Sequence, residues 1–315
     1  MKDGIYDMPV PGIVRAHGVW LEGYYDYEKH RNLNPGQQAN PTRRTVSGGV
    51  VSGVDVSQFT TGSVVKGHQI GFFSGYNSTR AKFSDTTDPV EGTNDSIGTL
   101  ENRQEVRGAF LGLYGSAVHG PVSADLTFKV DLFDVEQRFI ERNVSECAGG
   151  VTVTNILRQN STSLTNYTVA SNLNYRVALS GSHYLEPTVG LRYTHSDFGN
   201  NAAALGVRDG DVFRVQGGLR LGMTQVTPDG WVWKTSLTGL LYSDVMMSGL
   251  VITGPQGPGL SAISTPVDEG KLRAMGILET RVDVGRGYTF YGDVEVRGGQ
   301  DVFGFGSRLG VRYQW

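Results

Sequence analysis

Cysteine and long apolar runs are the two features that this chain most clearly lacks. Its 315 residues include a single cysteine, Cys147, so no intramolecular disulfide framework can support the fold. No run of about 20 apolar residues occurs, which excludes a bundle of membrane-spanning helices. The first residues lack a basic stretch followed by an apolar core, so no signal peptide is expected within them.

The chain also lacks a large excess of charge. Its formal net charge is -3 and its pI about 6.1, so a broad basic surface for nucleic acid is not expected. Its six histidines make no paired metal-ligand spacing, and with one cysteine neither a metal site nor another cofactor is expected. The apolar content of 38% still permits a membrane, because a spanning β-strand needs only about 9 to 11 residues with apolar side chains at alternate positions.

What the chain does have is alternation, most clearly in residues 303–315. Apolar side chains oppose glycine or polar ones there: Phe303, Phe305, Leu309, Val311, Tyr313 and Trp315 against Gly304, Gly306, Arg308, Gly310, Arg312 and Gln314. Successive side chains of a strand point to opposite faces, so a strand here has one apolar and one polar side. A strand that closes an outer-membrane barrel at the chain end needs this arrangement.

The same alternation recurs from about Val19 to the end and predicts about twelve strands. Their approximate ranges are 19–28, 46–57, 66–83, 105–118, 122–132, 167–179, 185–193, 213–223, 231–238, 271–284, 289–297 and 303–315. The facing of the third and fourth strands stays ambiguous, because glycine and aromatic residues occupy both phases.

The connections between these strands predict an up-and-down barrel. Tight links rich in turn-forming residues occur at 119–121, 181–183, 227–230 and 285–287. Long polar links lie between them, at 29–44, 84–103, 135–163, 199–210 and 243–270. Short periplasmic turns at one rim and long extracellular loops at the other are typical of a transmembrane antiparallel β-barrel, which is the all-β fold expected here.

Aromatic residues gather where the two membrane interfaces would be. Tyr184, Trp231, Trp233, Tyr288, Phe290, Tyr313 and Trp315 lie beside tight links, and Tyr25, Tyr27, Tyr193 and Phe303 lie beside long ones. Amphipathic rings are favoured at the headgroup level of a bilayer. A soluble all-β protein with aromatic cross-strand pairs is the alternative, but charges on the opposite face of most strands favour the membrane barrel.

The polar faces of the strands would enclose a lumen lined by charges of both signs. The predicted lumen-facing residues are Arg176, Arg192, Arg214, Arg220, Lys234, Arg281, Asp293, Glu295, Arg297 and Arg312. Lone charges in a narrow lumen are costly, so cross-strand ion pairs and water are expected. Such a hydrated wall would let an extended polypeptide pass through the lumen without binding tightly to it. For each single residue, the general need of a small barrel for inward polar side chains is an equally good explanation.

A family resemblance rests on four segments. The closing sequence Arg308-Leu-Gly-Val-Arg-Tyr-Gln-Trp315 resembles the outer-membrane β-signal, with Arg308, Gly310, Tyr313 and Trp315 at its characteristic positions. More specific are Trp20-Leu-Glu-Gly23-Tyr24, Gly48-Gly49 to Gly53-Val-Asp55, and Gly71-Phe-Phe-Ser-Gly75-Tyr76. From Val14 onward, the chain resembles the C-terminal translocator barrel of autotransporters, the type V secretion β-domain.

The resemblance implies an outer-membrane barrel that anchors a passenger preceding residue 1 and exports it through a polar lumen. It also implies insertion by the barrel assembly machinery, with Arg308, Gly310, Tyr313 and Trp315 as the assembly signal. Residues 1–15 would be a linker or remnant leading into the barrel, and residues 16–315 the barrel itself. Such barrels commonly hold an N-terminal helix in the pore, but Pro9 and Pro11 argue against a long helix within residues 1–18.

Lipid and lipopolysaccharide of the outer membrane are further expected partners of a monomeric barrel. The cluster of Lys29, His30, Arg31, Arg43 and Arg44 matches the phosphates of lipopolysaccharide, although a solvated loop is the favoured explanation.

Two other function classes stay open. A stand-alone porin or surface adhesin would use its long loops, and an outer-membrane hydrolase would carry catalytic residues at a rim. The pair Ser182-His183 lies in a tight link, where a turn explains it better than a nucleophile and base do, so no enzyme is expected. A repetitive region directly upstream of residue 1 would favour the translocator, and a signal peptide there would favour the porin or adhesin.

Overall fold

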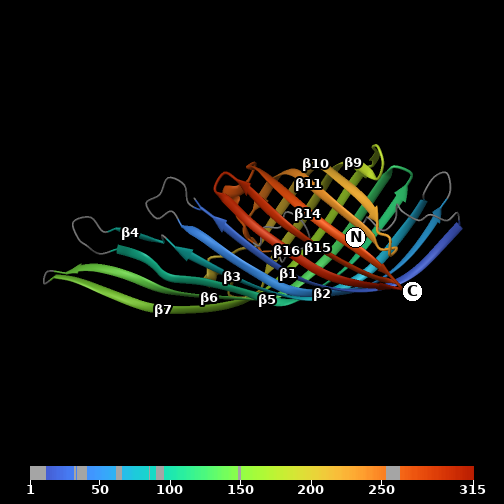
Figure 1. Cartoon of the computed structure of the whole chain (residues 1–315). Helices are drawn as coiled ribbons and strands as arrows, with labels where there is room; N and C mark the ends of the chain where they lie inside the picture. Colours follow the sequence, from blue (N-terminus) through green and yellow to red (C-terminus); the bar gives the residue numbers. More distant parts are fainter. Residues whose placement is uncertain are drawn as a thin grey trace.

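The chain folds as a closed antiparallel β-barrel (Figure 1). The computed structural model describes residues 12–31, 33, 41–61, 66–84, 86–89, 96–147, 150–252 and 263–315. Of the 14 strands in the main sheet, β4 and β8 are short additions, so the barrel wall has 12 strands. The predicted fold and strand number are therefore confirmed. Among the described residues, none of the helices is long and apolar enough to cross a membrane.

The wall strands are β1 (Gly12–His30), β2 (Thr42–Thr61), β3 (Lys66–Ser84), β5 (Ser96–His119), β6 (Val122–Cys147), β7 (Gly150–Tyr175), β9 (His183–Phe198), β10 (Gly210–Val226), β11 (Val232–Ser248), β14 (Leu272–Gly285), β15 (Tyr288–Gly299) and β16 (Val302–Gln314). The short additions are β4 (Thr87–Pro89) and β8 (Val177–Ala178). The long links contain β12 (Val251–Ile252), β13 (Ile263–Ser264) and the 3-10 turns η1 (Ala202–Leu205) and η2 (Pro266–Asp268).

The first and last strands close the barrel. β1 pairs with β16 from Gly18 opposite Gln314 to His30 opposite Val302, and each further strand pairs with the next one along the chain. The chain therefore enters the wall and leaves it at the same rim, where the tight turns lie. We call this end the tight-turn rim and the opposite end the long-loop rim.

The outer face of the barrel is apolar, as the alternation predicts. Large apolar side chains stay exposed on every wall strand, and in the closing strand Leu309 is 75% exposed. Their neighbours along the same strands are buried and mostly polar. A continuous exposed apolar surface is unfavourable in water but suits lipid, because hydrocarbon solvates it.

Part of the inner wall is aromatic, which the sequence did not predict. Trp20, Tyr24, Val51, Phe73, Phe110 and Tyr114 form one buried cluster on β1, β2, β3 and β5. The rings lie over glycines of the neighbouring strands: a Cβ on Gly53 would be 2.4 Å from the Trp20 ring, and one on Gly71 would be 2.3 Å from the Tyr114 ring. Glycine gives these inward rings their space, and this settles the ambiguous facing of β3 and β5.

The predicted polar link 135–163 was wrong as a loop, since β6 and β7 continue through almost all of it. They pair from Val122 opposite Tyr175 to Cys147 opposite Gly150, and Figure 1 shows this hairpin projecting beyond the other strands. Each strand has 26 residues, more than twice what a membrane crossing of about 9 to 11 residues requires. Outside the membrane both faces meet water, so the alternation that identifies a strand is lost.

Other strands also run further toward the long-loop rim than predicted. β1 reaches His30, β2 begins at Thr42, β5 begins at Ser96, and β11 reaches Ser248. Cross-strand hydrogen bonds continue into these ends because the paired partner is present, whether or not the side chains alternate. The predicted long links 29–44, 84–103 and 243–270 are correspondingly shorter.

Two of the predicted external loops fold inward at the long-loop rim. The loop carrying η1 and the described parts of the link between β11 and β14, residues 249–252 and 263–271, which we call the mouth loop, contribute to one buried cluster with the inner faces of β3, β5, β6, β7 and β9. This mouth core consists of Ala81, Val106, Phe133, Val135, Leu164, Phe198, Leu205, Val207 and Ile252. The Asn166 amide also donates a 2.5 Å hydrogen bond to the Ile252 carbonyl. The two loops thus cover part of the long-loop end of the lumen.

Candidate functional site in the barrel lumen

The lumen contains a cavity of about 330 Å³. Its lining comes from β1, β2, β3, β5, β6, β7, β9, β10, β11, β14, β15 and β16, so every wall strand contributes. One side is the aromatic cluster, and the rest includes the charged residues Lys129, Arg192, Arg220, Glu279 and Arg308. The cavity is therefore a chamber with one largely aromatic wall and a mostly polar remainder.

Two of the predicted lumen arginines share one carboxylate. Arg176 and Arg220 lie 3.2 and 2.9 Å from the two oxygens of the buried Glu186. The Arg176 guanidinium also lies 3.8 Å from the centre of the Tyr184 ring. Tyr184 is buried on the inner face, so its placement at an outer membrane interface was wrong. The ring faces inward because Gly222, opposite it on β10, leaves room.

The other predicted lumen residues differ in their contacts and in their burial. Arg308 pairs with Asp293 at 2.9 Å, and Arg312 pairs with Asp55. Lys234 and Arg281 lie opposite each other on β11 and β14 and are partly buried. Arg192 has no hydrogen bond or ion pair to any residue that the structure describes.

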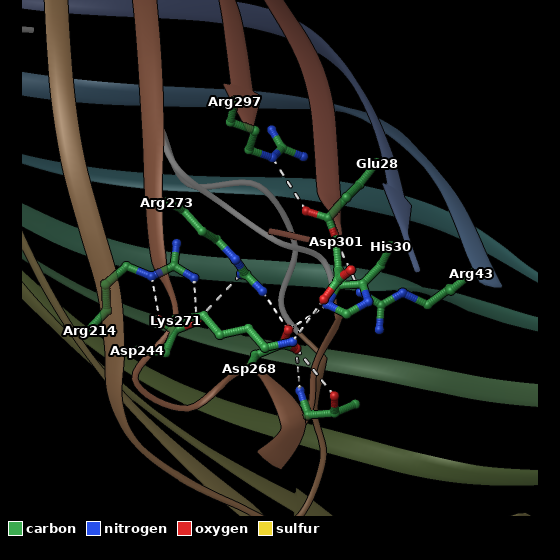
Figure 2. A network of polar contacts seen from close by, with 11 residues as sticks. Glu28, His30, Arg43, Arg214, Asp244, Asp268, Lys271, Arg273, Arg297 and Asp301 are labelled. Carbon is green, nitrogen blue, oxygen red and sulfur yellow. Dashed lines mark hydrogen bonds and ion pairs between the residues drawn. The ribbon is translucent and has the colours of Figure 1, made fainter. Parts of the chain in front are cut away.

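An ionic network occupies the long-loop half of the lumen (Figure 2). Arg297 is 1% exposed and makes two 2.7 Å hydrogen bonds to Asp26, with a third contact of 2.9 Å to Glu295. It also lies 3.3 Å from Glu28, which pairs with Arg43 at 3.0 Å. Buried charges are tolerated only when paired in this way, so the network holds β1, β2 and β15 in one arrangement.

The network continues into the mouth loop. Asp268 of η2 is 1% exposed, and its Oδ1 lies 2.5 Å from both His30 Nε2 and Arg273 Nη2. Arg273 reaches Asp244 at 3.8 Å, and Asp244 accepts two hydrogen bonds from Arg214 at 2.6 and 2.9 Å. Figure 2 shows Asp268 among these side chains. Asp268 therefore anchors the mouth loop to β1 and β14.

This placement corrects the predicted basic cluster for lipopolysaccharide. His30 and Arg43 are both buried and face inward, where they contact Asp268 and Glu28. Lys29 is partly buried, and only Arg31 and Arg44 are exposed. The five residues looked like one loop patch because the strands were expected to end before them.

Asp268 lies in a loop, outside the membrane-spanning segments, and its ionisation is strongly favoured. Burial alone would raise the pKa of this carboxyl, but the hydrogen bond from His30 and the charges of Arg273 and Arg43 outweigh it and hold the pKa well below its usual range. A depressed carboxyl pKa adds stability above the unfolded value of about 3.9, and this stability is lost only as the pH falls through the folded value. Asp268 should keep its anchoring charge at mildly acid pH.

Replacing Asp268 with asparagine should release the mouth loop. The amide keeps the shape but removes the negative charge that pairs with Arg273 and accepts the His30 contact, so the loop should open roughly tenfold more often. Protease added to the folded barrel should then cut the loop correspondingly faster. Glu269→Gln, an exposed neighbour on the same turn, is the control and should leave the cutting rate unchanged. Equal cutting rates for both variants would contradict the anchoring role.

The mouth loop of the wild-type protein should resist the protease equally at pH 7 and at about pH 5, because Asp268 stays ionised at both.

The four residues of the predicted assembly signal lie in β16. Arg308 and Gly310 face inward, and a Cβ on Gly310 would be 2.4 Å from the Tyr291 ring. Tyr313 and Trp315 face outward, with ring centres 5.7 Å apart. The Trp315 backbone exchanges two 3.0 Å hydrogen bonds with His17 of β1, so the last residue completes the closing seam.

Sequence reasoning missed the residues that anchor the mouth loop: His30 as an inward residue, Asp268 as its partner on the loop, and Asp244 on β11, which pairs with Arg214 and Arg273. A possible signal was Thr265-Pro-Val-Asp268, in which Thr265 and Asp268 form a capping box at a turn. That pattern predicts a turn but not its contact with β1.

The described residues show no arrangement suited to a metal: no three histidine, cysteine or carboxylate side chains gather closely enough to hold an ion. Ser182, in the turn before β9, and His183, the first residue of β9, are both exposed.

Comparison with known proteins identifies the barrel. The family model described as the autotransporter β-domain matches residues 19–295. No curated protein matches the chain significantly in sequence. Among solved structures, the β-domain of the Bordetella autotransporter BrkA is similar over 94% of this chain and 98% of that one, with a TM-score of 0.59 and 15% identity.

Two further solved structures share the fold. The transport unit of AIDA-I from Escherichia coli gives a TM-score of 0.56 at 12% identity over 94% of this chain and 89% of its own. The translocator domain of NalP from Neisseria meningitidis gives 0.51 at 14% identity over 94% and 88%. Since the family model covers most of the chain, this protein belongs to the autotransporter β-domain family and is a translocator barrel of the bacterial outer membrane.

Proposed function

We propose that this barrel anchors an N-terminal passenger and carries it through the lumen to the cell surface, with residues 1–15 leading from the passenger into the wall, where residues 12–15 already form the start of β1. The observation that carries the proposal is the closed wall around a chamber to which every strand contributes. Because β1 starts at the tight-turn rim, a passenger preceding it can reach the long-loop side only by crossing the barrel. A wall whose charges are largely paired offers few strong contacts to a moving polypeptide.

The mouth loop would have to move during export. It contributes Ile252 to the mouth core and Asp268 to the ionic network, both at the end where the polypeptide leaves. A polypeptide in transit would displace these contacts, and they would re-form behind it. Their re-formation would close the barrel to small solutes after export.

Assembly would depend on the closing strand. We propose that the barrel assembly machinery recognises Arg308, Gly310, Tyr313 and Trp315, because the two outward rings are accessible while β16 is still unpaired. The mature barrel would be a monomer surrounded by lipid and lipopolysaccharide, and the exposed Arg31 and Arg44 could contact phosphate groups.

The alternative functions receive less support. A stand-alone porin or adhesin does not account for the family membership. We also propose that the barrel is not an enzyme, since the exposed Ser182 and His183 have no orienting group beside them among the described residues.

A surface-display experiment tests the proposed function. A signal peptide and a small epitope-tagged passenger are fused before Met1, and whole cells are treated with protease. The passenger should be cut on intact cells while the barrel stays folded by heat-modifiability. A matched fusion to the barrel lacking Trp315 should leave the passenger protected. A correctly folded barrel with its passenger retained in the periplasm would refute export.

A further inference from the structure

Eight charged side chains line the lumen cavity, and two of them have no hydrogen bond or ion pair within the described part of the chain. Arg308 pairs with Asp293, Lys129 with Asp131, Arg220 with Glu186, and Asp125 accepts a hydrogen bond from Asn172, while Glu279 has a contact of its own. Arg192 and Glu22 make no hydrogen bond or ion pair with any described residue. The two have opposite signs and line the same cavity; Glu22 is attracted by Arg308, but at more than ion-pair distance.

The position of Arg192 in the sheet explains why it has no partner. Its neighbour on β7 is Ala170, which has no acceptor, and its neighbour on β10 is Arg214. Arg214 is already held by both oxygens of Asp244. The Nε of Arg192 is buried without an acceptor. Like charges directly opposite each other destabilise a strand pair. Asp244 and Glu295 attract Arg192 only from a distance, so no negative group of the described residues is in contact with its guanidinium.

The missing group is a carboxylate by its chemistry. A guanidinium offers two parallel N–H donors that match the two oxygens of a carboxylate, and burial strengthens such a pair. The cavity of about 330 Å³ is several times larger than the roughly 30 Å³ that one water molecule occupies in the liquid, so a carboxylate has room there. Glu22 lies on β1, which is equally far from β9 in both directions around the barrel, so Glu22 is on the wall opposite Arg192. Its negative charge disfavours an anion on its own side of the cavity.

We propose that Arg192 forms a carboxylate-binding site in the lumen. The carboxylate is either a free small anion or an aspartate or glutamate side chain of a polypeptide in the lumen, and only the second source rests on the proposed export function. In that case Arg192 gives the otherwise paired wall one point of contact with acidic segments.

The site can be tested on the whole refolded barrel with trifluoroacetate as the probe. The fluorine resonance of this carboxylate should broaden when it binds the wild-type protein. Arg192→Gln should weaken binding by about tenfold or more, because the charge-assisted fork is lost. Glu22→Gln is the matched control: it changes the other unpaired charge of the same cavity and should keep binding at least as strong. Heat-modifiability confirms that both variants fold.

If the glutamine variant does not fold, Arg192→Lys takes its place. This variant keeps the positive charge but loses the two parallel N–H donors, so it should also bind trifluoroacetate more weakly than the wild-type protein. No broadening with wild-type protein, or equal broadening with the Arg192 variants, would overturn the site.

Displacement distinguishes the two carboxylate sources. A short glycine-serine peptide with one glutamate should displace trifluoroacetate, and its glutamine analogue should not, if side chains of a polypeptide reach Arg192. Displacement by sodium acetate alone supports the site with small anions as its ligands. The export function would stand in either case, because it is measured separately by display of the passenger.

Discussion

Replacing Trp315 with aspartate is expected to abolish assembly of the barrel in cells while leaving refolding in detergent nearly normal. Trp315 lies at the tight-turn rim, where a charged side chain facing lipid costs only about 0 to 1 kcal/mol. Its backbone bonds to His17 remain possible with any residue. A large loss in cells would therefore report recognition by the assembly machinery. The measurement is the heat-modifiable fraction in membranes compared with the refolded fraction of purified protein.

The control for Trp315 is a lumen arginine with a shared partner. Arg176→Gln leaves Glu186 paired with Arg220, so it should assemble at nearly the wild-type level. Deleting Trp315 should resemble the aspartate variant in cells but also weaken refolding, because both backbone bonds to His17 are lost. Equal assembly of the Trp315 and Arg176 variants in cells would show that the last residue carries no signal.

Replacing Arg297 with alanine is expected to destabilise the folded barrel by about 3 to 5 kcal/mol. The change leaves the buried Asp26 and Glu295 without their shared cation, and it also removes one cation from Glu28, which still pairs with Arg43. Removing one partner of a buried network costs far more than the pair itself contributes, because the remaining charges stay desolvated. The measurement is the free energy of unfolding of refolded protein in urea.

Arg158→Ala is the matched control for Arg297. Arg158 pairs with Glu141 at 2.8 Å on the projecting hairpin, where its side chain is 50% exposed, so its loss should cost less than about 1 kcal/mol. Adding Asp26→Asn to Arg297→Ala should recover part of the stability, since one uncompensated charge is removed. Similar losses for Arg297→Ala and Arg158→Ala would mean that the network is hydrated and contributes little.

The family resemblance rested on short segments whose physical role the structure explains. Gly53 and Gly71 provide space for Trp20 and Tyr114, which is why glycines and aromatics recur together in the first strands. Their facing could not be read from alternation alone, because an inward ring next to an inward glycine looks the same as an outward ring. Only the register of neighbouring strands distinguishes the two cases.

By itself, the sequence determined which side of most membrane-crossing strands faces lipid, and hence the barrel and its strand number; the facing of β3 and β5 needed the structure. That information is local: residues two apart share a face, and lipid demands apolar side chains on one of the two. The same rule fails for residues 135–163, because outside the membrane both faces of β6 and β7 are wet and the strands are maintained by their pairing with each other.

Only the tertiary structure decided which inward charges are partners and how the mouth is covered. Asp268 and His30 are 238 positions apart, and Arg192 is isolated because Ala170 and Arg214 happen to be its neighbours in the sheet. Such contacts depend on the register of distant strands and on the path of a loop. Neither the strand register nor the loop path can be predicted from the residues next to a side chain in the sequence.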